Sequence, residues 1–409
     1  MSRIDELIAE LCPAGVHHAV LGEVGSFIRG NGIQKKDFTE SGVGCIHYGQ
    51  IFTHFGLAAT ETKSFVSPEL AARSRKAMPG DLVIATTSEN DEDVCKAVAW
   101  LGGEPVAVSS DAFIYRHSLE PKFVSYFFNS RSFQEQKRPL ISGTKVRRVS
   151  GEGLAKIRIP VPPLEIQREI VRVLDKFSQL EVELEVELEA RHRQYELYRD
   201  VLLTADAHVR KIALGDLGKW YGGGTPAKSV RRYWDDGTIP WLSPKDMTGD
   251  NVNSTQDRIA EAAINETPLR LVPANSVAVV VRSNILRRRL PIARVAIATA
   301  LNQDMRALVP AAGLLGSYAF FAIRASAEEI LATAGRTDGS MAAIESARLM
   351  SFKIPVPELV EQERIVAFLD MFDALVNDLS DGLPAELLAR RKQYEHYRDR
   401  LLTFKELAA

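Results

Sequence analysis

Residues 159–177, IPVPPLEIQREIVRVLDKF, return 195 residues later as residues 354–372, IPVPELVEQERIVAFLDMF, with 11 of 19 positions identical. A second pair, RHRQYELYRDVLLT at 191–204 and RRKQYEHYRDRLLT at 390–403, matches at 10 of 14 positions. A period this long is not that of a solenoid, whose repeats run to about 20–50 residues. The chain therefore contains one internal duplication, in which a lobe and a following segment each occur twice.

The first repeated segment is predicted to form one long helix. No Gly or Pro interrupts residues 164–204, and Glu and Leu are strong helix formers even where EVELEVELE alternates like a strand. Apolar residues recur every seven positions, as in the seam of a coiled coil. Some 40 residues rising about 1.5 Å each predict a rod of about 60 Å.

The second repeated segment is predicted to begin in the same way and then to break at residues 380–384, SDGLP. A proline inside a helix removes a hydrogen bond and clashes with the preceding turn. Because one segment leaves the first lobe and the other leaves the second, we expect the two to pack antiparallel. The alternative is two separate amphipathic helices, each lying on its own lobe. The residues expected to pack are Ile170, Leu174, Phe177, Leu184, Tyr195, Tyr198, Ile365, Leu369, Phe372, Tyr394 and Tyr397.

The predicted fold class is α/β or α+β, with two globular domains joined by two long helices in an antiparallel coiled coil, related by a pseudo-two-fold repeat. Residues 1–158, with a short N-terminal helix, are lobe one, and residues 208–353 are lobe two. Residues 159–207 and 354–409 are the central and C-terminal helical regions. Turn signals followed by apolar runs predict strands at 79–85, 105–108, 277–281 and 293–298, and helices at 123–136 and 318–332.

Charge is distributed unevenly along the chain, although its net value is only −2. Residues 15–160 hold 18 basic and 15 acidic residues, and residues 208–355 hold 19 and 13. The helical stretches 161–207 and 356–409 are acidic instead, with 6 basic against 11 acidic residues and 7 against 11. Mildly basic lobes suit a polyanionic partner, whereas the acidic helices are solvated surface or a docking face for partner subunits.

Several kinds of site are absent from the sequence. The three cysteines have no CxxC spacing, which argues against a disulfide framework or a zinc ribbon and fits a reducing cytoplasm. No P-loop, serine elbow or dinucleotide fingerprint occurs, no apolar run approaches the ~18 residues of a membrane span, and the acidic start MSRIDELIAELCP predicts no secretory signal. Asp37 with Glu61 and Lys63 is a weak nuclease-like trace that is kept as an alternative.

Both lobes contain short segments that combine cations with turn residues and with hydroxyl or amide side chains. Arg and Lys neutralise phosphates, Arg is the commonest bidentate reader of guanine, and Asn suits adenine. Each cluster taken singly is ordinary solvated surface, but their occurrence in both lobes favours a nucleic-acid interface. The candidate DNA-binding residues are Lys35, Lys36, Thr87, Ser88, Asn90, Lys145, Arg147, Arg148, Lys228, Arg231, Arg232, Ser243, Lys245, Arg282, Ser283, Asn284, Arg287, Arg288 and Arg289. No catalytic or metal-binding residue is assigned.

The repeated pattern IPVPPLxxQ…IVxxLD…QYExYRDxLLT resembles the conserved regions of type I restriction-modification specificity (S) subunits. The opening IDELIAELCPAGV…LGEVG is similar to their N-terminus. PGDLVIATTSENDEDVCKAVAWLG and SGTKVRRVSGEGLAKIRIPVPPL in lobe one resemble their first target-recognition domains, and IPWLSPKDM, RSNILRRRLPIA and LNQDM in lobe two resemble a second one. The resemblance covers essentially the whole chain.

This resemblance implies a non-catalytic, cytoplasmic DNA-recognition subunit without a membrane partner. Each lobe would read one half of a bipartite, asymmetric site in double-stranded DNA, and the helices would set the spacer and dock methyltransferase (M) subunits. The M subunits would hold S-adenosylmethionine and methylate adenine N6, motor-nuclease (R) subunits would join for cleavage, and this chain would bind no cofactor. The interruption at 382–384 leaves the spacer length open. The alternative is a structural adaptor with protein-binding lobes, and gathering of Arg282 and Arg287–Arg289 on one concave face would favour DNA.

Overall fold

The computed structural model describes residues 3–204, 209–337, 339–378 and 381–407. Contacts divide the chain into two compact units, of which unit one is Met1–Glu185 with Glu386–Ala409 and unit two is Val186–Ala385. Each unit therefore combines one lobe with parts of both helical segments. The four predicted domain limits stay a prediction.

Unit one contains two sheets and two small ladders. The larger sheet has the order β2-β11-β7-β9-β4, with antiparallel neighbours except for the parallel pair β9 and β4. Its strands are β2 (Gly25–Arg29), β11 (Ala112–His117), β7 (Leu82–Ala85), β9 (Ala97–Trp100) and β4 (Ala58–Ala59). The second sheet, in the order β5-β3-β10-β6, consists of β5 (Ser64–Val66), β3 (Val43–Ile46), β10 (Val106–Val108) and β6 (Lys76–Ala77). The ladders join β1 (His18–Val20) to β13 (Arg158–Pro160) and β8 (Thr87–Ser88) to β12 (Arg147–Arg148).

Unit two repeats this topology. Its larger sheet, β15-β22-β19-β20-β17, again has antiparallel neighbours except for the last pair. The strands are β15 (Gly218–Gly222), β22 (Met305–Pro310), β19 (Ser276–Val280), β20 (Ile292–Val295) and β17 (Asn251–Val252). The smaller sheet joins β18 (Asp257–Ile259), β16 (Ile239–Leu242) and β21 (Ala300–Leu301), and the ladders join β14 (Lys211–Ala213) to β25 (Lys353–Pro355) and β23 (Gly335–Arg336) to β24 (Ala343–Ile344). The shared strand order confirms that the lobes as well as the helical segments are duplicated.

Short helices surround each pair of sheets. Those of lobe one are α1 (Arg3–Leu11), α2 (Leu21–Val24), α3 (Tyr48–Thr53), α4 (Pro68–Arg73), α5 (Pro121–Phe128), α6 (Arg131–Lys137) and α7 (Gly151–Ala155), with 3-10 turns η1 (Lys35–Asp37) and η2 (Arg138–Leu140). Those of lobe two are α9 (Glu261–Glu266), α10 (Gly316–Ala325), α11 (Ala327–Ala334) and α12 (Ser346–Ser351), with 3-10 turns η3 (Leu214–Asp216), η4 (Arg231–Tyr233), η5 (Pro244–Asp246) and η6 (Asn284–Arg287). The stretch predicted as one helix at 123–136 is two helices, because the Ser130 hydroxyl accepts from the Phe133 N–H and starts α6 anew.

An aromatic helix forms the centre of the core in each lobe. In α5, all six residues from Phe123 to Phe128 are buried, and in α10 so are the six from Tyr318 to Ile323. A helix that is apolar on all sides needs cover on more than one face. Residues of the main sheet and apolar residues of the long helices share these cores with α5 and α10 and supply that cover.

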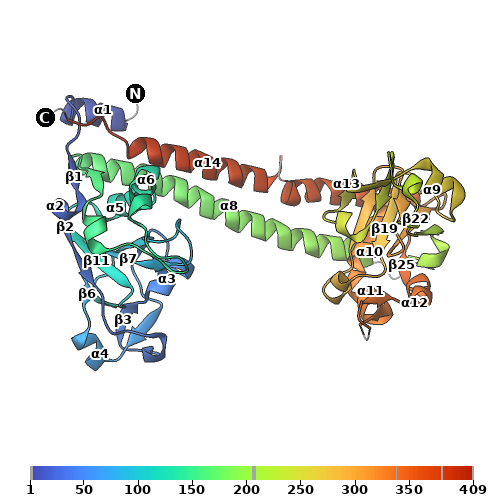
Figure 1. Ribbon diagram of the computed structural model, residues 1–409, viewed down its shortest axis with the longest axis horizontal. Helices are drawn as coiled ribbons and strands as arrows, with labels where there is room; N and C mark the ends of the chain where they lie inside the picture. Colours follow the sequence, from blue (N-terminus) through green and yellow to red (C-terminus); the bar gives the residue numbers. More distant parts are fainter. Residues whose placement is uncertain (1–2, 205–208, 338, 379–380, 408–409) are drawn as a thin grey trace. The chain divides into compact units, whose positions relative to one another are not determined.

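The first repeated segment is one uninterrupted helix, α8 (Leu164–Thr204), as predicted. In unit one it lies beside α14 (Leu383–Leu401), as Figure 1 shows. The Phe177 and Tyr397 rings stack with centroids 5.3 Å apart, and Arg391 forms ion pairs with Glu181 and Glu185. Rising residue numbers on α8 meet falling numbers on α14, so the two helices are antiparallel.

In unit two the later part of α8 packs antiparallel to α13 (Leu359–Asn377). Tyr195 stacks on Phe372 with centroids 6.5 Å apart, and Tyr198 meets Phe368 edge-on at 5.5 Å. Tyr195 is buried but its hydroxyl has no hydrogen-bond partner among the described residues.

The predicted interruption of the second segment is confirmed. Helix α13 ends at Asn377 and α14 begins at Leu383, while the Gly382 N–H donates to the Asp378 carbonyl at 3.1 Å. Pro384 lies in the first turn of α14, where its missing N–H removes no helical bond. Ser380 lies outside the described residues.

The packing residues of the two segments serve the lobes as well as each other. Ile170 and Leu174 are fully buried in the lobe-one core, and Ile365 and Leu369 are buried in the lobe-two core. Leu184 is only partly buried. Helix-on-helix and helix-on-lobe packing, expected as alternatives, therefore occur together.

Candidate nucleic-acid interface

Two short strands bring four of the predicted residues together in lobe one. In the β8–β12 ladder, Arg147 lies opposite Ser88 and Arg148 opposite Thr87. Gly143 makes the turn before β12 with a φ of +91°, and an added Cβ would lie 2.1 Å from the Val146 carbonyl oxygen. We call this ladder, with loop 89–95, the lobe-one edge.

Loop 89–95 of the lobe-one edge is held from both sides. The Asn90 side chain accepts from the Asp93 N–H and donates to the Asp93 carboxylate, both at 2.7 Å. From α6, the Lys137 ammonium donates to the carbonyls of Glu92 and Val94, both at 2.9 Å. Lys137 is only 1% exposed, and burial lowers its pKa. The loop is therefore anchored to the lobe interior by a buried cation.

Arg147 is engaged at both sides of its guanidinium. Nε lies 2.7 Å from Oδ1 of Asp91, and Nη1 donates to the Gly143 carbonyl at 2.5 Å. The side chains of Arg147 and Asp91 remain 34% and 54% exposed. This arginine is thus accessible to a ligand but paired inside the lobe.

Lobe two places its cations differently. Directly after β19, Arg282 bridges to Ala343, and its Nε lies 2.5 Å from Asp304. The Ser283 hydroxyl accepts from the Ile285 N–H and caps η6. Arg287 donates to the carbonyls of Thr337 and Gly339 at 3.3 and 3.0 Å. The exposed residues of this loop include Asn284, Arg288 and Arg289.

We call residues 281–289, 335–337 and 339–344 the lobe-two edge, because the duplication relates it to the lobe-one edge. The offset of 195 residues carries Thr87 to Arg282 and Arg148 to Ala343, and both pairs face each other across the backbone. The same offset relates the acidic stretch 89–93, ENDED, to the basic stretch 284–288, NILRR. In lobe one the arginine of this facing pair is its second member, Arg148, whereas in lobe two it is the first member, Arg282.

A groove beside the small sheet of lobe two is lined by a second group of cations. Lys228, Arg231 and Arg258 line it together with Trp234 and Trp241. The two indoles meet edge-on with centroids 5.2 Å apart, and Asp235 and Asp257 add carboxylates. Both charge signs therefore occur on its walls.

The remaining candidates lie outside these clusters or are engaged locally. Lys35, Lys36 and Lys145 are exposed. Arg232 pairs with Glu266 at 2.5 Å and Lys245 with Asp257 at 2.6 Å. Ser243 is 5% exposed and its hydroxyl donates to Asp246 at 2.8 Å, so its polar group is used inside the lobe. Base or phosphate contacts by any of these residues stay a prediction.

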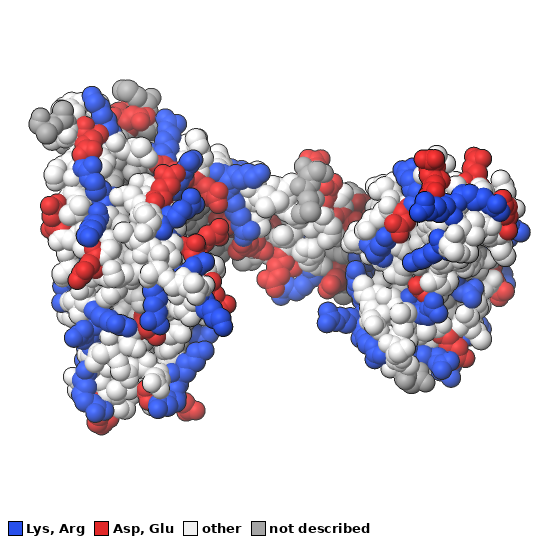
Figure 2. Space-filling view, in the orientation of Figure 1, with Lys and Arg blue, Asp and Glu red and all other residues white. Residues whose placement is uncertain are grey.

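The face of the molecule drawn in Figure 2 carries no continuous basic patch among its described residues. In the view of Figure 2, Lys and Arg side chains occur over both lobes and alternate with Asp and Glu. The two edges are identified by the facing residue pairs that they share across the repeat, and not by the overall charge of the surface.

Two glutamines outside the set of candidate residues attach the lobes to the helices. Gln167 on α8, 3% exposed, accepts from the Glu120 N–H at 2.9 Å and donates to the Pro162 carbonyl at 2.7 Å. Gln362 on α13, 0% exposed, accepts from the Leu315 N–H and donates to the carbonyls of Gly313 and Pro357, each at 2.9 Å. Their identity across the repeat is the signal that could have revealed them.

A carboxylate at matching repeat positions adds a second attachment. Asp175 on α8 accepts from the Tyr126 hydroxyl at 2.8 Å and from the Lys122 ammonium at 2.7 Å. Its counterpart Asp370 on α13 accepts from Arg294 at 2.6 Å. The glutamine and the aspartate of the repeated motif IPVPxL…Q…LD therefore fix each lobe to a helix. They do so in both lobes, although the side chains on the two edges differ.

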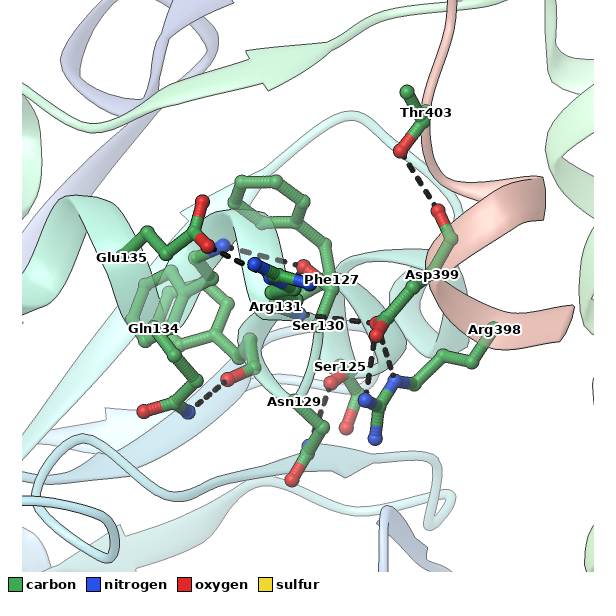
Figure 3. A network of polar contacts seen from close by, with 12 residues as sticks. Ser125, Phe127, Asn129, Ser130, Arg131, Gln134, Glu135, Arg398, Asp399 and Thr403 are labelled. Atoms are coloured by element: carbon green, nitrogen blue, oxygen red, sulfur yellow. Dashed lines mark hydrogen bonds and ion pairs between the residues drawn. The ribbon is translucent and has the colours of Figure 1, made fainter. Parts of the chain in front are cut away.

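The YRD part of the second repeat joins α14 to lobe one, as Figure 3 shows. Oδ1 of Asp399 accepts from the backbone N–H of Arg131, the first residue of α6, at 3.0 Å, and from Arg398 at 3.0 Å. The carboxylate thereby satisfies an N–H at the start of a helix, where negative charge is favoured. Tyr394, one turn away on α14, packs against the lobe-one core.

No catalytic arrangement is seen in the described part of the chain. Among those residues, no group of three or more His, Cys, Asp or Glu side chains could hold a metal ion. Asp37 accepts from the Gln34 N–H, and Glu61 lines a groove with Lys76 and Trp100. The described helices include none that is both long and apolar enough to cross a membrane.

Comparisons with known proteins agree with this architecture. The family model of the type I restriction modification DNA specificity domain matches residues 19–191 and 208–389. The chain is 45% identical over 293 residues to the type I restriction enzyme EcoR124I/EcoR124II specificity subunit of Escherichia coli, covering 69% of this chain and 70% of that protein. A solved structure concerned with complex assembly and conformational transition of the type I R-M system has a TM-score of 0.66 at 19% identity, covering 95% of this chain and 97% of its own. The HsdS subunit from Thermoanaerobacter tengcongensis has a TM-score of 0.58 at 19% identity, covering 96% and 97%.

Proposed function

Because the chain belongs to the type I restriction-modification specificity subunits, we propose that lobe one and lobe two each recognise one half of a bipartite DNA site through their edges. The observation that carries this proposal is the pair of equivalent edges with arginine on opposite strands. One scaffold with different side chains at the same place suits two different half-sites. The chain is a DNA-recognising subunit and not an enzyme.

The catalytic groups then belong to partner subunits. Methyltransferase (M) subunits dock on the helical segments, hold S-adenosylmethionine and methylate adenine N6, and motor-nuclease (R) subunits join them for cleavage. This chain itself binds no cofactor and works in the cytoplasm. The family membership supports this assignment, since the relatives are specificity subunits of type I restriction enzymes.

The helical segments set the number of base pairs between the half-sites. Insertion of one heptad after Leu184 in α8, matched by one in the second segment, should lengthen the recognised gap, because a heptad adds about 10 Å of helix. Mapping of the methylated motif measures the gap. An unaltered gap would show that the helical segments do not set the spacing between the half-sites.

Methylation mapping tests the proposal as a whole. The chain is co-expressed with the methyltransferase subunit encoded beside it, and N6-methyladenine is mapped by single-molecule sequencing. A split, asymmetric motif that disappears without this chain is the expected result. No motif, despite a purified complex of the two proteins, would favour a structural adaptor with protein-binding lobes.

A further inference from the structure

Lobe one presents an arginine and a carboxylate bound to each other at its proposed DNA-binding edge. The Arg147 guanidinium lies 2.7 Å from the Asp91 carboxylate, and the two side chains are 34% and 54% exposed. The Nε donor that Asp91 occupies is one that a phosphate or a guanine edge can use. DNA that engages Arg147 through Nε must therefore displace Asp91.

We propose that Asp91 is a specificity-determining residue, which keeps Arg147 from non-specific DNA until the correct half-site replaces its carboxylate. The inference rests on the proposed function, because it requires the lobe-one edge to contact DNA. Asp91 acts as a competitor whose presence lowers binding to any sequence that offers phosphates alone.

The ion pair between Arg147 and Asp91 is weak enough for a correct half-site to displace the carboxylate. Exposed ion pairs contribute little to folding, because solvent screens them and ordering two side chains offsets the attraction. Such a pair lowers the affinity of a competing phosphate by about two- to fivefold. A half-site that also supplies base contacts overcomes a competition of this size, and random sequence does not.

The carboxylate cannot simply swing away with its loop. Asn90 ties the loop to Asp93 on one side, and Lys137 ties the carbonyls of Glu92 and Val94 to α6 on the other. Asp91 thus stays at the edge after Arg147 leaves it. There it adds to the repulsion that the exposed Glu89 and Glu92 exert on phosphates.

The equivalent loop of lobe two carries no counterpart of Asp91, although Arg282 elsewhere on the lobe-two edge pairs with Asp304. The repeat offset carries Asp91 to Leu286, which is 5% exposed, and Lys137 to Ala332. Arg287 is bonded to neutral carbonyls, and the exposed Arg288 and Arg289 follow it. The basic loop of lobe two therefore lacks the acidic competitor that loop 89–95 of lobe one places beside Arg147.

The test compares Asp91→Asn with Glu89→Gln, which removes the same charge from the same loop. Among the described residues, no hydrogen bond or ion pair involves the Glu89 side chain, so it is the matched control. The full chain in complex with its M subunits is titrated with a mixed-sequence duplex and with a duplex carrying the mapped motif, at salt concentrations from about 50 to 200 mM. Each variant is also made in an Arg147→Ala background.

Asp91→Asn should bind the mixed-sequence duplex about two- to fivefold more tightly, with a salt slope steeper by about 0.9, because one more phosphate is neutralised. Glu89→Gln should change this affinity less than twofold at an unchanged slope. With Arg147→Ala, the two variants should become equal. Wild-type binding with equal effects of Asp91→Asn and Glu89→Gln would overturn this proposal alone. Failure of the wild-type complex to bind either duplex would overturn the proposed function as well.

Discussion

The lobe-one and lobe-two edges occupy the same place in the same strand order, yet their charges are arranged in opposite ways. In lobe one the arginines lie on β12 and face an acidic loop. In lobe two Arg282 stands on the opposite strand, and the equivalent loop is basic. The attachments beneath the edges have changed much less, since Gln167 and Gln362 make the same kind of bonds.

This difference teaches which parts of the fold are free to change. The glutamine and aspartate attachments hold each lobe on a helix through backbone groups and a few side chains. The edges lie on loops and short ladders whose exposed side chains can change while buried residues such as Val94 and Leu286 hold them on the core. Recognition can therefore diverge at the edges while the scaffold and its attachments stay fixed.

The largest expected effect breaks an attachment. Gln362→Leu keeps the side-chain volume but leaves the Leu315 N–H and two carbonyls unpaired, which should lower the free energy of unfolding by about 3–5 kcal/mol. Gln167→Leu, which loses two bonds, should cost about 2–4 kcal/mol. Urea denaturation of the purified chain measures both. The exposed Gln179→Leu on α8 is the control, and a loss for Gln362→Leu no larger than for the control would contradict the attachment.

The next effect is a loss of stability at acid pH that we expect in lobe one and not in lobe two. Burial lowers the pKa of His117 in lobe one to about 4 from 6.5, whereas the equivalent strand position in lobe two is Pro310. Because the folded pKa is depressed, the neutral ring stabilises the fold above pH 6.5. This stabilisation is lost as pH falls toward 4, by up to about 3 kcal/mol.

Replacement of this histidine isolates its share of the acid sensitivity. His117→Phe should flatten the stability profile between pH 6.5 and 4 relative to wild type, as followed by thermal unfolding at several pH values. Parallel profiles of the two proteins would show that other groups cause the acid sensitivity.

A smaller effect concerns the lobe-one edge. Arg147→Ala or Arg148→Ala should weaken binding of the motif duplex by about 1–3 kcal/mol where a base contact is lost, and should reduce the salt slope by about one where a phosphate contact is lost. Fluorescence titrations across salt concentrations distinguish these cases. An affinity and a slope that both stay unchanged would remove the residue from the interface.

The smallest effect concerns the lobe-two edge. Arg288→Ala should weaken binding to the motif duplex and the mixed-sequence duplex alike, with a loss about threefold greater at 50 mM than at 200 mM salt, as expected for one lost phosphate contact. The same titrations provide the measurement. A loss restricted to the motif duplex would instead make Arg288 a base-reading residue and blur the contrast between the edges.

The sequence predicted the scaffold well, because the physics behind it is local. Heptad spacing predicted α8, and the SDGLP stretch predicted the break between α13 and α14. The pairing of Arg147 with Asp91 and the burial of Ser243 were not predictable, since both depend on strands that meet only after folding. The attachments of Gln167 and Gln362 were visible as repeat identities, but their roles needed the backbone groups that they bind.

The central claim is that each lobe reads its own half-site through its own edge. Its most direct test maps N6-methyladenine in cells that express the methyltransferase with the wild-type chain or with Arg282→Ala. The account predicts a bipartite motif for wild type and, for the variant, a motif relaxed in one half and unchanged in the other. Relaxation of both halves together, or a motif identical to that of wild type, would contradict it.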